Sequence, residues 1–186
     1  MKKILALLMA LCLISVSAAA LAEPTAADGS PVKLDGLTLN LEAGAYYQLG
    51  TKTVEQIYIS VFPYVAGGDA STNFNVVWAG GTGTVTVNDI RAQVPDLKEQ
   101  MKAGFESYGY TVNSMEYADP LDATLAGEPC VSLDSKLSLS GNGMTVETNQ
   151  RQFYVGTKGF IITASAGDTA SLEALATLMD SVIVWD

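Results

Sequence analysis

Residues 131–166, with the sequence VSLDSKLSLSGNGMTVETNQRQFYVGTKGFIITASA, predict the centre of the fold. Apolar and polar side chains alternate at the start, which is typical of a strand with one buried face, here Val131, Leu133, Leu137 and Leu139. Gly141-Asn142-Gly143 and Gly156-Thr157-Lys158-Gly159 are turn sequences, because glycine and asparagine tolerate positive φ angles. The segment therefore predicts three antiparallel strands joined by two tight turns.

A helix is predicted directly after this meander. Asp168 or Thr169 can cap its start, and Glu173 is expected in the first turn, where the helix dipole favours a carboxylate. The apolar face consists of Leu172, Leu175, Ala176, Met179 and Val182. We expect Ile183-Val184-Trp185 to end the chain as an extended tail.

A longer helix is predicted before the meander. Its apolar residues are spaced by three or four positions, at Ile90, Val94, Leu97, Met101, Phe105 and Tyr108. Asn88 or Asp89 can cap the start, and Gly109 can end the helix in a left-handed conformation. Pro95 removes one backbone hydrogen bond, so we expect a kink or two collinear pieces.

The remaining apolar runs predict strands. Leu37, Leu39 and Leu41 alternate with polar residues, and the runs 57–62 and 74–78 are rich in β-branched and aromatic side chains. A Gly/Asp/Ser cluster between these two runs predicts a hairpin with a longer loop, and residues 110–117 predict another strand. The expected fold class is a single α+β domain, a mainly antiparallel β-sheet with helices packed on it.

The first 22 residues have the pattern of a cleavable secretory signal. Lys2-Lys3 precedes the apolar run 4–16, and Ala20-Leu21-Ala22 forms a small-x-small cleavage site. Small and polar residues with two prolines occupy positions 23–36, so we expect a flexible tether there. These features predict export, cleavage after Ala22, no stable membrane insertion afterwards, and one folded domain over residues 37–186.

Composition excludes several kinds of site. The chain has no histidine, so a Ser-His-Asp triad, a Cys-His pair and imidazole metal ligands are ruled out. Cys130 is the single cysteine beyond residue 22; it cannot form an internal disulfide there and is expected to be a buried small hydrophobe. The same segment has eight basic and twenty acidic residues, a formal charge of −12, which disfavours nucleic acid as a partner.

The order of these elements resembles the PsbP/DcrB-like superfamily over about residues 36–185. The phrases behind the resemblance, besides the long helix and the terminal helix, are Leu37-Thr38-Leu39-Asn40-Leu41 with Gly44, Asn73-Phe74-Asn75-Val76-Val77, Leu125-Ala126-Gly127-Glu128-Pro129-Cys130, Gln150-Arg151-Gln152-Phe153-Tyr154-Val155 and Phe160-Ile161-Ile162-Thr163-Ala164. The resemblance implies an α/β/α sandwich and an accessory or binding role, with no shared catalytic residue or cofactor. Many exported relatives are lipoproteins, whereas this signal lacks a cysteine at its end.

A polar stripe in the second strand of the meander is the candidate binding surface. Thr148, Gln150 and Gln152 are predicted to lie on one side of that strand, and Tyr154 continues the row. Amides and hydroxyls beside an aromatic ring suit a peptide or a sugar. The alternative is a solvent-facing or partner-facing sheet surface.

Acidic residues close in sequence are candidates for a calcium site or for acid–base chemistry, namely Asp119, Asp122, Glu128 and Asp134. They form no calcium-loop motif, so a solvated acidic surface is the plainer interpretation. The expected function is a secreted or envelope-associated, non-catalytic binding or accessory protein for an unknown envelope protein or small ligand, without a cofactor. The alternatives are a carboxylate-dependent hydrolase of cell-wall or other glycans, and a structural or assembly factor with weak calcium binding.

Overall fold

The structure is a computed structural model that describes residues 25–49, 57–63, 72–80, 83–141 and 143–186. The predicted secretory signal and the predicted loop before residue 72 lie outside these residues. Neither of the described helices is long and apolar enough to cross a membrane.

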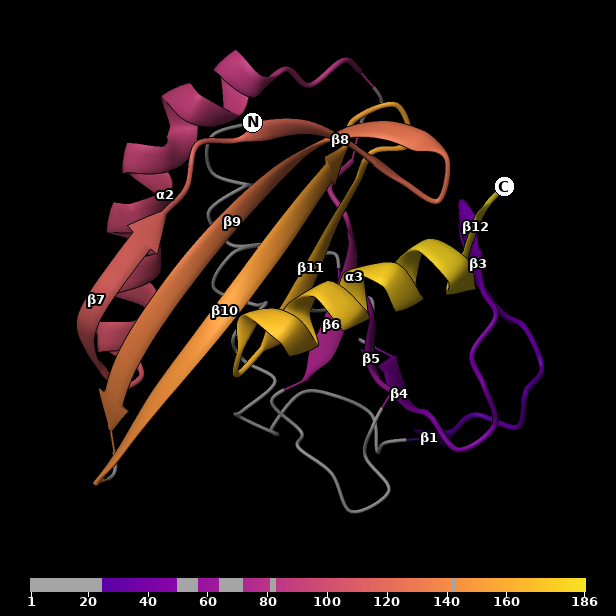
Figure 1. The fold of residues 1–186 in the computed structure, drawn as a ribbon, viewed down its shortest axis with the longest axis horizontal. Helices are drawn as coiled ribbons and strands as arrows, with labels where there is room; N and C mark the ends of the chain where they lie inside the picture. The colour runs from indigo at the N-terminus through magenta and orange to yellow at the C-terminus, as the bar shows by residue number, and fades with distance from the viewer. Residues whose placement is uncertain (1–24, 50–56, 64–71, 81–82, 142) are drawn as a thin grey trace.

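A large antiparallel sheet forms the middle of the molecule, and Figure 1 shows its two longest strands, β9 and β10, side by side. Its strands follow the order β1-β4-β5-β6-β11-β10-β9-β7, and β8 pairs with the first part of β9. A second, three-stranded sheet has the order β12-β3-β2. The strands are β1 (Thr25–Ala26), β2 (Val32–Leu34), β3 (Leu37–Leu39), β4 (Tyr46–Leu49), β5 (Ile57–Phe62), β6 (Asn73–Trp78), β7 (Thr111–Tyr117), β8 (Leu121–Leu125), β9 (Glu128–Gly141), β10 (Met144–Val155), β11 (Phe160–Ala166) and β12 (Ile183–Trp185).

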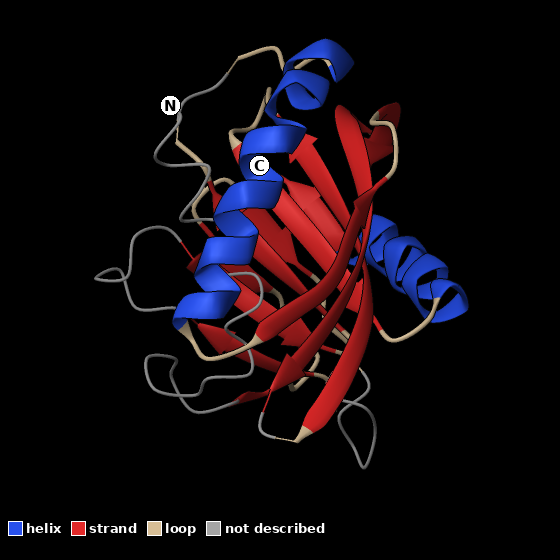
Figure 2. Ribbon diagram, turned by 90° about the vertical axis from the view of Figure 1, so that its left-hand side faces the viewer, coloured by secondary structure: helices blue, strands red, loops and turns tan. Residues whose placement is uncertain are grey.

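Helices α2 (Val87–Ser107) and α3 (Thr169–Val182) lie on opposite faces of the large sheet (Figure 2). Because side chains alternate along each strand, the sheet contributes to two separate cores. The core under α2 includes Ile90, Leu97, Met101, Leu133 and Tyr154. The core under α3 includes Leu172, Leu175, Phe74, Ile162 and Leu37. This arrangement confirms the predicted α+β class, a mainly antiparallel sheet with helices packed on it.

The three-stranded meander is confirmed. β10 pairs antiparallel with β9 and with β11. Val131, Leu133, Leu137 and Leu139 are all buried on one face of β9, as their alternation predicted. The predicted hairpin of β5 and β6 is also present, with an irregularity near Ile59.

The helix ends follow short-range hydrogen bonding. Thr86 caps α2, not Asn88 or Asp89 as predicted; its Oγ1 accepts from the backbone N–H of Asp89 at 3.2 Å, and the Asp89 carboxylate accepts from the backbone N–H of Thr86 at 2.9 Å. These bonds hold the pKa of Asp89 below its usual value. Pro95 lies inside α2 on its exposed side, and α2 continues as one helix. Asp168 caps α3 as predicted.

The predicted tether over residues 23–36 is wrong for its described part. β1 pairs with β4, and β2 pairs with β3 through the turn Asp35-Gly36, where Gly36 has a φ of +97°. An aspartate followed by glycine between apolar residues is itself a hairpin signal. The predicted extended C-terminal segment is confirmed as extended, and it is also paired, because β12 pairs with β3 and the Trp185 ring packs on Phe160 with a centroid distance of 5.8 Å.

Two valines of β10 test the burial pattern by the same substitution. Val155→Ala should lower the free energy of unfolding by about 2–4 kcal/mol, because the side chain is fully buried and its loss leaves a cavity. Val146→Ala, at a site that is 48% exposed, should cost less than about 1 kcal/mol. Urea unfolding of both variants measures the difference, and equal losses would contradict the assigned register.

Candidate functional site

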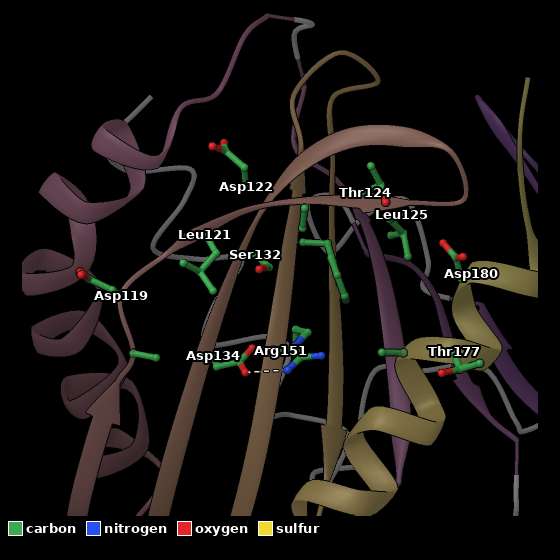
Figure 3. A pocket seen from close by; sticks show the side chains of 14 residues that line it. Asp119, Leu121, Asp122, Thr124, Leu125, Ser132, Asp134, Arg151, Thr177 and Asp180 are labelled. Atoms are coloured by element: carbon green, nitrogen blue, oxygen red, sulfur yellow. Dashed lines mark hydrogen bonds and ion pairs between the residues drawn. The ribbon is translucent and has the colours of Figure 1, made fainter.

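A cleft of about 480 Å³ opens on the α3 side of the sheet, between β8 and α3 (Figure 3). Strands β9 and β10 supply its floor, and the segment before β8 supplies one wall. The lining residues are Ala118, Asp119, Leu121, Asp122, Ala123, Thr124, Leu125, Ser132, Asp134, Arg151, Phe153, Ala176, Thr177 and Asp180.

Arg151 lies at the floor of the cleft and joins three elements. Its Nε and Nη2 atoms donate to the Asp134 carboxylate of β9 at 2.7 and 2.8 Å. Its Nη1 and Nη2 atoms donate to the Glu173 carboxylate of α3 at 3.0 and 2.9 Å. Hydrogen bonds to Asp134 and then Glu173 raise the pKa of the Arg151 guanidinium above its usual value. Paired bonds of this kind are geometrically specific, so Arg151 fixes α3 against the sheet.

Three further aspartates lie around the rim of the cleft, and Figure 3 shows the Asp180 side chain on the α3 side, whereas the Asp122 side chain points away from the cleft on β8. Asp119 lies 3.2 Å from Nε of Arg91 but is 76% exposed, so this ion pair is a weak restraint. Asp122 is exposed on β8. The carboxylates that the cleft itself presents are therefore those of Asp134 and Asp180, beside one arginine.

The tip of the β8–β9 hairpin is held at the cleft rim by the C-terminal end of the chain. Ala126 and Gly127 both have positive φ angles, +48° and +80°, which a two-residue hairpin turn of the mirror-image type requires. The left-handed conformation is unfavourable for alanine. Asp180 accepts a hydrogen bond from the backbone N–H of Ala126 at 2.6 Å, and Trp185 Nε1 donates to the Leu125 carbonyl at 3.1 Å. The turn is therefore anchored to α3 and β12.

Three of the four predicted acidic residues, Asp119, Asp122 and Asp134, lie along the lining of the cleft, but their carboxylates are not brought together. Asp119 pairs with Arg91 of α2, and the Asp122 side chain points away from the cleft. Glu128 does not line the cleft; it lies 3.6 Å from Lys158 Nζ and accepts a hydrogen bond from Thr157. Among the described residues, no group of three or more acidic or cysteine side chains is placed to hold a metal ion. The cleft therefore offers charge and apolar surface to a ligand, not a ready coordination sphere.

Three residues of the site were missed in the sequence, namely Arg151, Glu173 and Asp180. Glu173 was expected to serve the helix dipole, but it lies beyond the first turn of α3 and binds Arg151. The available signal was the lone arginine of β10, which shares a strand face with Phe153. An unpaired charge beside a buried aromatic residue indicates a partner on the facing element.

The predicted polar stripe is not an exposed surface. Gln150, Gln152 and Tyr154 are only 1%, 2% and 3% exposed, and Thr148 is half-buried. They face the α2 side, because Tyr154 belongs to the core under α2. The expectation of a solvent-facing or partner-facing stripe is therefore corrected.

Cys130 is buried, as predicted. Burial and, to a smaller extent, the negative charge of Asp180 raise the pKa of its thiol to about 11. Both causes disfavour the thiolate, which is the reactive form of cysteine.

The substitution Arg151→Gln tests the floor of the cleft. It should lower the free energy of unfolding by about 2 kcal/mol, because two carboxylates lose their charged partner in a partly buried setting. Lys102→Gln breaks an exposed pair on α2 with 3.9 Å between its charged atoms and should cost less than about 0.5 kcal/mol. If urea unfolding gives the same loss for both variants, Arg151 does not fix α3.

The pKa of Cys130 predicts its reactivity. At pH 8 the folded protein should react with a disulfide reagent at least about tenfold more slowly than the urea-unfolded chain, because its thiolate is rarer. The rate for the folded protein should rise with pH until about pH 11 and then level off. Fast labelling at pH 8 without urea would show that the thiol is accessible and ionised.

The comparisons concern the fold. No known protein family matches the chain, and no curated protein matches it. The chain is similar in structure to cyanobacterial PsbP (CyanoP) from Synechocystis sp. PCC 6803, with 11% identity and a TM-score of 0.49, over 92% of this chain and 95% of that chain. It is also similar to LpqN, involved in cell envelope biogenesis of Mycobacterium tuberculosis, with 18% identity and a TM-score of 0.37, over 87% and 90% of the two chains.

Proposed function

We propose that the chain is an extracytoplasmic, non-catalytic binding protein that holds a small cationic ligand in the cleft between β8 and α3. The observation that carries this proposal is the charge of the lining, in which the carboxylates of Asp134 and Asp180 accompany a single basic residue, Arg151, while Asp119 and Asp122 add negative charge around the rim. Arg151 is neutralised by Asp134 and Glu173, so it does not repel a cation that approaches the rim.

The charge of the whole domain supports the same ligand class. Twenty acidic and ten basic residues in the chain produce a negative potential, and a concave surface concentrates such a potential. A cation is therefore attracted to the cleft before it makes any contact there.

The apolar part of the lining restricts the chemical class of the ligand further. Leu121 is 64% exposed at the cleft, and Phe153 and Ala176 contribute apolar surface deeper in it. A bare ion gains nothing from these groups, whereas the methylene chain of an organic amine can cover them. Hydroxyl groups of Ser132 and Thr177 can accept hydrogen bonds from its ammonium groups.

The N-terminal sequence supports an extracytoplasmic location for this binding protein. A basic start, an apolar run and a small-x-small site within the first 22 residues are the features of a secretory signal. The proposal therefore places the binding protein in the cell envelope or outside the cell, as an accessory component.

Calorimetric titration with spermidine at low ionic strength tests the proposal. The affinity should fall about threefold in Asp180→Asn, because one exposed carboxylate of the cleft contributes a modest electrostatic attraction and the amide oxygen can still accept the bond from Ala126. Glu99→Gln removes an exposed charge from α2, on the opposite face, and should leave the affinity unchanged. Raising the salt to physiological strength should weaken binding of the parent protein.

Other outcomes separate the alternatives. If spermidine does not bind, or if both variants bind it equally, the cleft is not a cation site. Stabilisation by millimolar calcium without spermidine binding would favour the assembly factor with weak calcium binding. Release of reducing sugar from envelope glycans, lost in Asp180→Asn, would favour the carboxylate-dependent hydrolase.

A further inference from the structure

Of the two carboxylates that the cleft presents, the one of Asp180 has no cationic partner in the described part of the chain. The charge of Asp134 is already compensated, because Asp134 binds Arg151. Asp180 Oδ1 accepts a hydrogen bond from the backbone N–H of Ala126 at 2.6 Å, and Oδ2 has no hydrogen bond with a described residue. An ammonium group that enters the cleft therefore finds an uncompensated carboxylate at Asp180.

The residue that donates to Asp180 has an unfavourable backbone conformation. Among the described residues, Ala126 is the only one other than glycine with a positive φ, +48°. This conformation is unfavourable because the Cβ of an L-residue lies too close to the following carbonyl oxygen. It persists only where the surrounding structure holds it, and residues held in this way are concentrated at binding sites.

A single peptide unit connects Asp180 to the C-terminal strand. The carbonyl of Leu125 accepts from Trp185 Nε1 at 3.1 Å, and the N–H of the next residue, Ala126, donates to Asp180. This C=O and this N–H belong to one planar trans peptide, in which they point in opposite directions. The two hydrogen bonds therefore fix its orientation together. The Trp185 ring is itself held, because β12 pairs with β3 and the ring packs on Phe160.

We infer that the peptide between Leu125 and Ala126 positions the Asp180 carboxylate for the ammonium group of the ligand, an inference that rests on the proposed cation-binding function. Ala126 and Trp185 are its positioning residues. Neither is among the residues that line the cleft, so their effect on binding is indirect. A carboxylate with one oxygen fixed by a backbone donor loses less freedom when the ligand binds its second oxygen. The affinity therefore depends on a turn and on a strand outside the cleft.

Two substitutions of similar size at Ala126 test the role of the turn. Ala126→Asn creates Asn-Gly, the preferred sequence for a two-residue turn with positive φ at both positions, and should bind spermidine as tightly as the parent protein does. Ala126→Val places a β-branched side chain at this φ, which opposes the turn, and should weaken binding about threefold. Calorimetric titration of the full chain, expressed with its own leader, measures both affinities at low ionic strength.

The two tryptophans of the chain provide a second matched pair. Trp185→Phe removes the N–H donor to Leu125 but keeps an aromatic ring beside Phe160, and should also weaken spermidine binding about threefold. Trp78→Phe is the control; Trp78 is 41% exposed and does not line the cleft, so the affinity should stay unchanged. If Trp185→Phe does not fold, the Ala126 pair decides.

Asp180→Asn separates positioning from a general distortion of the cleft. The amide oxygen of this variant can still accept from Ala126, but the charge is gone. If the turn acts through the charge of Asp180, adding Ala126→Val to Asp180→Asn should lower the affinity by less than about 1.5-fold. A distorted cleft would instead lose the same factor of about three in both backgrounds.

Two results would overturn this inference and leave the cation site in place. In one, folded Ala126→Val and folded Trp185→Phe bind spermidine as tightly as the parent does. In the other, Ala126→Val weakens binding equally with and without Asp180→Asn. Absence of spermidine binding by the parent protein would overturn the proposed function, and this inference with it. The two failures are therefore distinguishable.

Discussion

The register of β10 between β9 and β11 is the constraint on which the cleft and the buried polar groups behind it depend. Arg151 lies opposite Asp134, and Gln150 lies opposite Ser135 and Ser165. Because neighbouring residues of a strand point to opposite faces, a shift by one position would turn the guanidinium toward α2 and the amides toward α3. The paired hydrogen bonds of Arg151 with Asp134 and Glu173 oppose such a shift, since they form only in this register.

The two faces of the sheet differ in electrostatic character, since one carries carboxylates and the other carries buried neutral polar groups. The α3 face carries an open cleft whose carboxylates come from β9 and α3, and the one cation among its described lining residues is neutralised by hydrogen-bonded partners. The α2 face carries neutral polar groups at low exposure. Charges remain where water can reach them, and amides and hydroxyls lie where a charge could not be solvated. The sheet therefore separates a surface that attracts cations from an interior that suits neutral hydrogen-bonding groups.

Local patterns in the sequence predicted the helices and strands well, but they predicted strand pairing and helix caps less well. The meander, the apolar face of α2 and the cap at Asp168 depend on residues close together in the chain. The segment before Leu37 was predicted to be a tether, although Asp35-Gly36 is a hairpin signal. Its strand was missed because Val32 and Leu34 are half-buried only through pairing with β3. The Thr86 cap was missed because its partner Asp89 was itself assigned as the cap.

The sequence by itself determined the period of each element, the absence of imidazole chemistry, the negative charge and the pattern of an export signal, because these depend only on residue type and spacing. Only the tertiary structure decided which face of β10 is covered. The alternation of Gln150, Arg151 and Gln152 is the same whether the amides face solvent or an interior layer. Burial is set by the elements packed above each face, so the predicted exposed stripe is buried, and Asp134 meets Glu173 only through Arg151.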